Sequence, residues 1–164
     1  MSKDAPTQPL RDEHCALLPE LAALRAAADA VGTAAESQHL QRAHRLVLRH
    51  LVPHMDAEEA VLYPAINHVA GADVTASLRR DHDEIRRRAA ALEAPAPEPN
   101  DRRGNRLRAA LYGLDAVIQL HLDKEEELYY PILDRHLDDE AAVKLVVAMH
   151  EVERDLRGHR GVGP

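Results

Sequence analysis

The sequence predicts an all-α protein, an antiparallel up-down four-helix bundle with a short fifth helix at its C-terminus. The first observation is composition: Ala, Leu, Arg and Glu dominate while Phe and Trp are absent, so helix formers are abundant and residues that strands favour are scarce. The second is periodicity, because apolar residues recur at spacings of three and four along several long segments. The third is that most connections are short, which makes consecutive helices antiparallel neighbours. The 164 residues suffice for one domain with its own core.

The first half of the chain is expected to form two long helices. The first should run from about Leu10 to Val31 and stop at Gly32, a residue typical of helix C-termini. Residues 33–36, Thr-Ala-Ala-Glu, have the form of a capping box and would open the second helix, which should end near Gly71. Prolines interrupt the helical patterns at positions 19, 53, 64 and 131, and each should kink or end its helix there.

The second half is expected to hold a third and a fourth long helix and the shorter fifth one. The third starts near Asp73 and is separated from the fourth by the proline-rich loop at 94–100. Asp138 or Asp139 should cap the fifth helix, and residues 1–9 and 158–164 should be flexible ends around a domain of residues 10–157. The fourth helix has the cleanest period, at positions 107, 111, 114, 118, 121, 125, 128 and 132. This stripe, which contains one His and one Glu, should face a partner along its whole length.

Composition also excludes several classes of protein. A formal charge of -7 argues against nucleic acid as a partner. Cys15 is the single cysteine, so the chain can form neither an internal disulfide nor a cysteine-based zinc site. The N-terminus lacks the apolar stretch of a signal peptide, and no apolar run approaches the roughly 20 residues of a membrane helix. We therefore expect a cytoplasmic protein with no membrane partner.

A repeated motif links the second and fourth helices. Residues 54–64 read HMDAEEAVLYP and residues 121–131 read HLDKEEELYYP, so His, Glu, Tyr and Pro recur at the same offsets. A histidine on the core stripe precedes each motif at nearly the same distance, 40 residues in the first half and 39 in the second. A third His-x-x-x-Glu, at 136–140, overlaps an expected helix boundary and is interpreted as accidental. The chain thus consists of two helix pairs of one design.

The repeat predicts a site for two metal ions. His and Glu four residues apart lie on one helix face, and the distances to the helix ends place both motifs and both preceding histidines at one level of the bundle. Four imidazoles and two carboxylates in a core would be destabilising without a cation. Two bridging carboxylates and two histidines per ion would give each metal four protein bonds and leave room for small ligands. The predicted metal ligands are His14, His54, Glu58, His82, His121 and Glu125.

These motifs, with both Tyr-Pro endings, resemble the hemerythrin-like (HHE cation-binding) domains over nearly the whole chain, as a hemerythrin-like domain of residues 10–157. The resemblance implies a four-helix bundle around a non-haem diiron centre, with two oxo- or hydroxo-bridged iron ions. Members of the family carry oxygen, sense oxygen or iron, or react with peroxide or nitric oxide. Oxygen carriers have a His-x-x-x-His on the third helix, whereas here Leu78 and Arg86 stand four residues either side of His82. The difference argues against reversible oxygen carriage.

The expected function is therefore a non-haem diiron protein that binds or reacts with small oxidants, hydrogen peroxide or dioxygen. The alternative is a sensing or storage module for oxygen or iron without turnover, and manganese or zinc would also suit the ligands.

Several neighbouring residues leave alternatives open. His50 lies one turn before His54 and is either a further ligand or a residue at the rim. Glu13 and Asp81 either orient imidazoles or face solvent. Tyr129 is expected near the centre, whereas the tyrosines at 63 and 130 are expected to anchor the end of the bundle.

Overall fold

The computed structural model describes residues 5–93 and 100–160. All regular structure in these residues is helical, which confirms the predicted all-α class. The expectations for residues 1–4, for the loop at 94–99 and for residues 161–164 lie outside the described residues. Within the described part, the first helix begins at Gln8 and the last helix ends at Arg160, so helical structure extends beyond both ends of the predicted domain.

The first predicted helix is two helices, α1 (Gln8–Leu17) and α2 (Ala22–Ala30). The break falls at Pro19, which has no backbone N–H to continue the helix. Turn hydrogen bonds, such as that from the Leu21 N–H to the Leu17 carbonyl at 3.3 Å, carry the chain across it. Gly32 then ends the segment with φ +84°, a conformation that suits glycine.

The second predicted helix is continuous in direction but mixed in type. It consists of α3 (Glu36–Leu46), a π-helical turn η1 (Val47–Leu51), α4 (Val52–Ala57), a second π-helical turn η2 (Glu58–Leu62) and α5 (Tyr63–Ala70). The capping box forms in a modified way, because the Glu36 carboxylate accepts a hydrogen bond from the Gly32 N–H at 2.6 Å while Thr33 Oγ1 accepts one from Ala35. Gly71 ends this segment with φ +112°.

The fourth predicted helix repeats this pattern. It consists of α7 (Asn100–Lys124), the π-helical turn η3 (Glu125–Tyr129) and α8 (Tyr130–His136). The prolines at 53, 64 and 131 each follow a π-helical turn by one residue. The residue before each proline donates its N–H to the carbonyl five positions back, Tyr63 to Glu58 and Tyr130 to Glu125. These prolines therefore neither end nor break the long helices; a widened turn precedes each one.

The widened turn in the fourth helix moves its buried stripe by one residue. Up to Glu125 the buried positions follow the predicted spacing. Beyond it, Leu128 is 59% exposed although the period places it in the core, and Tyr129 and Leu133 are buried instead. The predicted stripe was therefore wrong at 128, whereas Ile132 is partly buried against the core. The reason is that one extra residue in the π-helical turn rotates the positions that follow.

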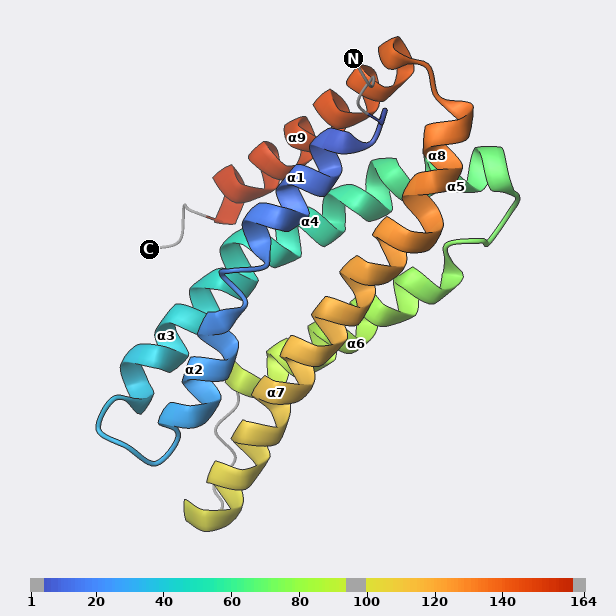
Figure 1. Cartoon of the computed structure of the whole chain (residues 1–164). Helices are drawn as coiled ribbons and strands as arrows, with labels where there is room; N and C mark the ends of the chain where they lie inside the picture. The colour runs from blue at the N-terminus through green and yellow to red at the C-terminus, as the bar shows by residue number, and fades with distance from the viewer. Residues whose placement is uncertain (1–4, 94–99, 161–164) are drawn as a thin grey trace.

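The remaining helices are α6 (Ala76–Glu93) and α9 (Asp139–Arg160). In Figure 1, α6 lies along α7, α2 packs between α3 and α7, and α9 runs beside α1 and α4. Asp138 caps α9 by accepting a hydrogen bond from the Ala141 N–H at 2.8 Å, as predicted. With 22 residues α9 is not the short helix expected, because it continues to Arg160, beyond Val152, the last of the apolar positions that predicted it.

Two apolar clusters fill the interior. One lies among α2, α3, η1, α4, α6 and α7 and includes Leu24, Leu51 and Leu111. The other lies among α1, η2, α5, α6, α8 and α9 and includes Leu10, Leu62 and Leu133. Between them is a buried layer of polar side chains. Among the described residues, no helix is both long enough and apolar enough to cross a membrane.

Candidate metal centre

The polar layer contains all six predicted ligands, with His54 the most exposed at 7% and the others at 0–1%. They come from α1, α4, η2, α6, α7 and η3, so each of the four predicted long helices contributes. The two glutamates stand at the first position of η2 and of η3. π-helical turns are frequent at functional sites because they re-aim side chains that a regular helix would direct elsewhere.

Glu58 lies between two pairs of histidines. Its Oε1 is 2.9 Å from His54 Nε2 and 4.0 Å from His14 Nε2. Its Oε2 is 3.2 Å from His82 Nε2 and 3.9 Å from His121 Nε2. Glu58 therefore belongs to two groups of potential metal-binding atoms, one with each histidine pair, and the atoms of each group lie within 4.8 Å of one another.

Glu125 lies between the same two pairs of histidines. Its Oε2 is 3.5 Å from His14 Nε2, and its Oε1 is 3.7 Å from His121 Nε2. Each carboxylate thus presents one oxygen to each histidine pair. This is the arrangement that a bridge between two cations requires.

The donor atoms at the centre fit a cation better than they fit one another. His54 Nε2, both carboxylate oxygens of Glu58 and Glu125 Oε2 are buried and make no well-oriented hydrogen bond among the described residues, although His54 Nε2 and Glu58 Oε1 lie 2.9 Å apart. A buried polar atom without a partner costs roughly 1–3 kcal/mol, and more when it is charged. Metal ligation would satisfy all four atoms at once, so the residues present fit a pair of metal ions.

Carboxylates behind the ring orient two of the histidines. The Nδ1–H of His14 donates to Glu126 Oε1 at 3.0 Å, and that of His82 donates to Glu59 Oε1 at 2.7 Å. A proton held at Nδ1 leaves the Nε2 lone pair directed at the centre. The sequence interpretation missed both carboxylates, although each directly follows a predicted bridging glutamate, at the same place in the repeat.

Glu13 and Asp81 lie behind the other two histidines. Glu13 Oε2 is 3.9 Å from His54 Nδ1, and Asp81 Oδ2 is 3.7 Å from His121 Nδ1. Each therefore faces the histidine of a neighbouring helix, not the one beside it in sequence. These distances are longer than a hydrogen bond. His54 Nδ1 has a closer partner at 2.9 Å in Glu153 of α9, a residue without a counterpart in the repeat.

The tyrosines lie opposite to expectation. The hydroxyl of Tyr129 donates to the carbonyl of Val74 and contacts Ser77, away from the centre. The hydroxyls of Tyr63 and Tyr130 lie at the centre instead.

Tyr63 Oη is 2.9 Å from His82 Nε2 and donates to Glu125 Oε1 at 3.1 Å, while Tyr130 Oη is 3.0 Å from His14 Nε2. Each tyrosine follows its bridging glutamate by five residues, which is the hydrogen-bond spacing of a π-helical turn and one residue more than that of an α-helix. The only sequence signal was that Tyr-Pro recurs at the same offset. Burial, with the nearby carboxylates, raises the pKa of both phenols, so they stay protonated and can donate hydrogen bonds.

Without metal, protons balance the charges in the core. Burial and repulsion from Glu58 raise the pKa of Glu125, so the two carboxylates do not both ionise. Burial alone would lower the pKa of His121, but Glu125 and Asp81 raise it to about 10. Burial also opposes the charge of His54, yet Glu58 and Glu153 hold its pKa well above the usual value. Burial lowers the pKa of His14 to about 3.

These pKa shifts predict that metal uptake releases protons and weakens as the pH falls. The raised pKa values of His54, His121 and Glu125 favour their protonated forms in the metal-free protein, and a metal ion must displace those protons. His14 is already neutral and contributes none. Metal affinity should therefore rise with pH towards the pKa of His121 near 10. Titrating metal into weakly buffered apo protein with a pH indicator measures the release; uptake without any proton release would contradict these protonation states.

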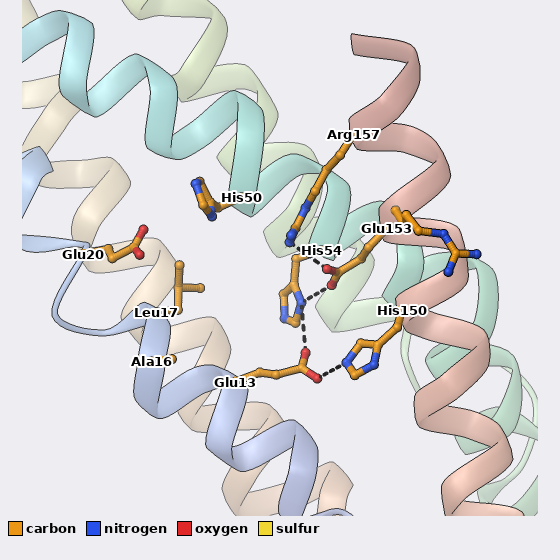
Figure 2. Close-up of a pocket in the computed structure, with 10 residues that line it drawn as sticks. Glu13, Ala16, Leu17, Glu20, His50, His54, His150, Glu153 and Arg157 are labelled. Atoms are coloured by element: carbon orange, nitrogen blue, oxygen red, sulfur yellow. Dashed lines mark hydrogen bonds and ion pairs between the residues drawn. The ribbon is translucent and has the colours of Figure 1, made fainter. Parts of the chain in front are cut away.

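The remaining histidines lie outside the two central groups. His136 is exposed and bonded to the Ile132 carbonyl, and Glu140 is exposed on the next helix, so the third His-x-x-x-Glu does not form a site. His50 is exposed and lines a cleft of about 510 Å³ beside His54 (Figure 2), and the potential ligand groups among the described residues do not include it.

Fold and site together describe an all-helical protein whose buried His/Glu clusters can bind metal cations. The family model described as the hemerythrin HHE cation binding domain matches residues 5–133, and the chain belongs to this family. No curated protein and no solved structure matches the chain. The match ends before α9, so the last helix of the described chain is an addition to the part that the family model covers.

Proposed function

We propose that this hemerythrin-like four-helix bundle holds two iron ions and uses them to react with hydrogen peroxide. The proposed ligands are His14 and His54 for one ion and His82 and His121 for the other, with Glu58 and Glu125 bridging. The observation that supports the proposal most strongly is that the carboxylates of Glu58 and Glu125 each lie between the two histidine pairs. Each offers one oxygen to each histidine pair.

The ligand count supports reactivity over reversible oxygen carriage. Six residues give each metal four bonds, which is fewer than octahedral coordination offers. The third helix supplies one histidine only. Leu78 lies in the apolar core, and Arg86 bonds to Glu59 and Asp56 at 2.7 Å each, so neither can act as a further ligand. Open positions suit direct reaction with a small oxidant.

The residues around the centre support peroxide as the substrate. Bound iron would supply the two-electron redox chemistry. The protonated hydroxyls of Tyr63 and Tyr130 stand at the centre, where they can donate hydrogen bonds to the oxygens of a bound oxidant. Buried Leu51, Ile85 and Ile118 belong to the apolar cluster on one side of the polar layer and exclude bulk water from that side. Disproportionation needs no other reactant, since one peroxide is reduced to two waters while a second is oxidised to dioxygen.

The test is to follow peroxide and dioxygen together. Iron-loaded protein should consume hydrogen peroxide and release one dioxygen for every two peroxides, as measured with an oxygen electrode. Reduced protein should be oxidised by air irreversibly, so that evacuation does not restore its spectrum. Loaded protein that leaves peroxide intact, or that recovers its reduced spectrum under vacuum, would contradict the proposal.

A sensing or storage role remains the second candidate, and α9 is the observation that favours it. This helix lies outside the family match yet contacts a proposed ligand, so a change at the metals could reach the surface through it. Metal analysis of protein purified from its own host, with visible spectra before and after peroxide, separates the roles. A sensor would change its spectrum once, without repeated turnover.

A further inference from the structure

The C-terminal helix α9 reaches the metal centre from outside the region that the family model matches. It packs against α4 and η2, the two elements that carry His54 and Glu58. Figure 2 shows Glu153 pointing from α9 towards His54, at the wall of the cleft. Nothing in the internal repeat corresponds to α9, so its contribution exists on one side of the centre only.

Glu153 is held firmly where it meets His54. Its Oε1 is 2.9 Å from His54 Nδ1, and its Oε2 accepts a hydrogen bond from Arg157 Nη2 at 2.7 Å. The residue is only 7% exposed. One carboxylate oxygen therefore serves the histidine while the other is fixed by an arginine one helical turn away.

The repeat shows what α9 changes. On the other side of the centre, Asp81 Oδ2 lies 3.7 Å from His121 Nδ1 and 2.7 Å from Lys124 Nζ. Its counterpart, Glu13, stands 3.9 Å behind His54. His150 of α9 holds Glu13 at 2.5 Å, while Glu153 takes the closer place at His54 Nδ1.

Although Glu13, His54 and Glu153 bring one nitrogen and two oxygens within 4.8 Å, they do not form a third metal site. Both carboxylates already have polar partners in α9, His150 for Glu13 and Arg157 for Glu153. His54 Nε2 faces the central bridge, which leaves Nδ1 as the atom that Glu153 orients.

We propose that Glu153 is a positioning residue that makes the metal pocket of His14 and His54 different from that of His82 and His121. By accepting the Nδ1–H of His54, Glu153 fixes the ring and leaves the Nε2 lone pair for the metal. Within the described part of the chain, His121 Nδ1 has the more distant Asp81 in this place, so the two pockets of an otherwise repeated centre differ in affinity and in electronic environment. This inference rests on the proposed two-metal function.

The experiment compares Glu153→Ala and Glu153→Gln with the wild-type chain and with Glu151→Ala, an exposed residue of the same helix. Loss of such an orienting partner typically costs about 10–100-fold in metal affinity. Glu153→Ala should therefore bind one of its two ions about 10–100-fold more weakly. It should also change one of the two iron signals in the Mössbauer spectrum at saturating iron. Glu153→Gln keeps an oxygen that can accept the Nδ1–H and should recover most of the affinity, and Glu151→Ala should match wild type.

A purely structural role is separated by its different readout. If Glu153 only held α9 in place, Glu153→Ala would lower the melting temperature of the apo protein and leave both iron signals unchanged, and the inference would be wrong. Should Glu153→Ala not fold, Arg157→Ala removes the clamp on the carboxylate from the exposed end of the cleft and should give the same change more weakly. If the wild-type protein binds two ions and the Glu153 variants bind them equally well with the same iron signals, this inference alone is wrong. If the wild-type protein binds fewer than two ions, the proposed function itself is wrong.

Discussion

Glu58→Ala is expected to bind no more than one metal ion per chain, and to bind that ion weakly. Glu58 is the one residue shared by both groups of potential ligands, and its two oxygens are the nearest carboxylate atoms to His54 Nε2 and His82 Nε2. Removing it deletes one ligand from each proposed ion. Removing one metal ligand also leaves buried histidines without a counter-charge, which burial makes unfavourable.

Glu125→Ala should have the smaller effect of the two. Glu125 stands 3.5 Å or more from its histidines and belongs to neither group, so its loss should weaken the pair of ions while leaving three donors to each. Elemental analysis after loading and desalting measures the stoichiometry, with circular dichroism to confirm that each variant folds. His136→Ala is the matched control, because it disrupts the exposed third motif and should retain two ions. Metal loss in His136→Ala together with full loading of Glu58→Ala would refute the ligand assignment.

Removal of the metal should lower the melting temperature by about 10–20 °C. A ligand present at 100 times its dissociation constant stabilises the fold by roughly 2.7 kcal/mol, so two independent sites contribute about 5 kcal/mol. For a domain of this size, each kcal/mol moves the melting temperature by about 2–4 °C. The metal-free core also retains unpartnered buried atoms at His54, Glu58 and Glu125.

Differential scanning calorimetry of apo and iron-loaded protein at one pH measures this shift. The melting temperature should rise with the concentration of free metal, as mass action requires. The Glu58→Ala variant is the control, since its melting temperature should respond little to iron. Equal melting of the apo and loaded wild-type protein would show that metal does not bind in the folded core.

The sequence by itself determined the helical class and brought six residues to one level. Both results come from periodicity, which is local: a spacing of four puts His and Glu on one helix face wherever the helix is placed. The repeat between 54–64 and 121–131 was equally visible, because it needs only the order of residues. Caps at Gly32, Gly71 and Asp138 were predictable for the same reason.

Only the tertiary structure decided which residues surround the six. The π-helical turns at Glu58 and Glu125 shift the helix face by one residue, so Tyr63 and Tyr130 reach the centre while Leu128 turns outwards. The sequence does not show where a π-helical turn will form. A proline can follow such a turn, as at positions 53, 64 and 131, or it can end a helix, as Pro19 does after α1. The role of Glu153 could not be predicted from the sequence. Its contact with His54 joins residues 99 positions apart, and no local sequence pattern shows how their two helices pack.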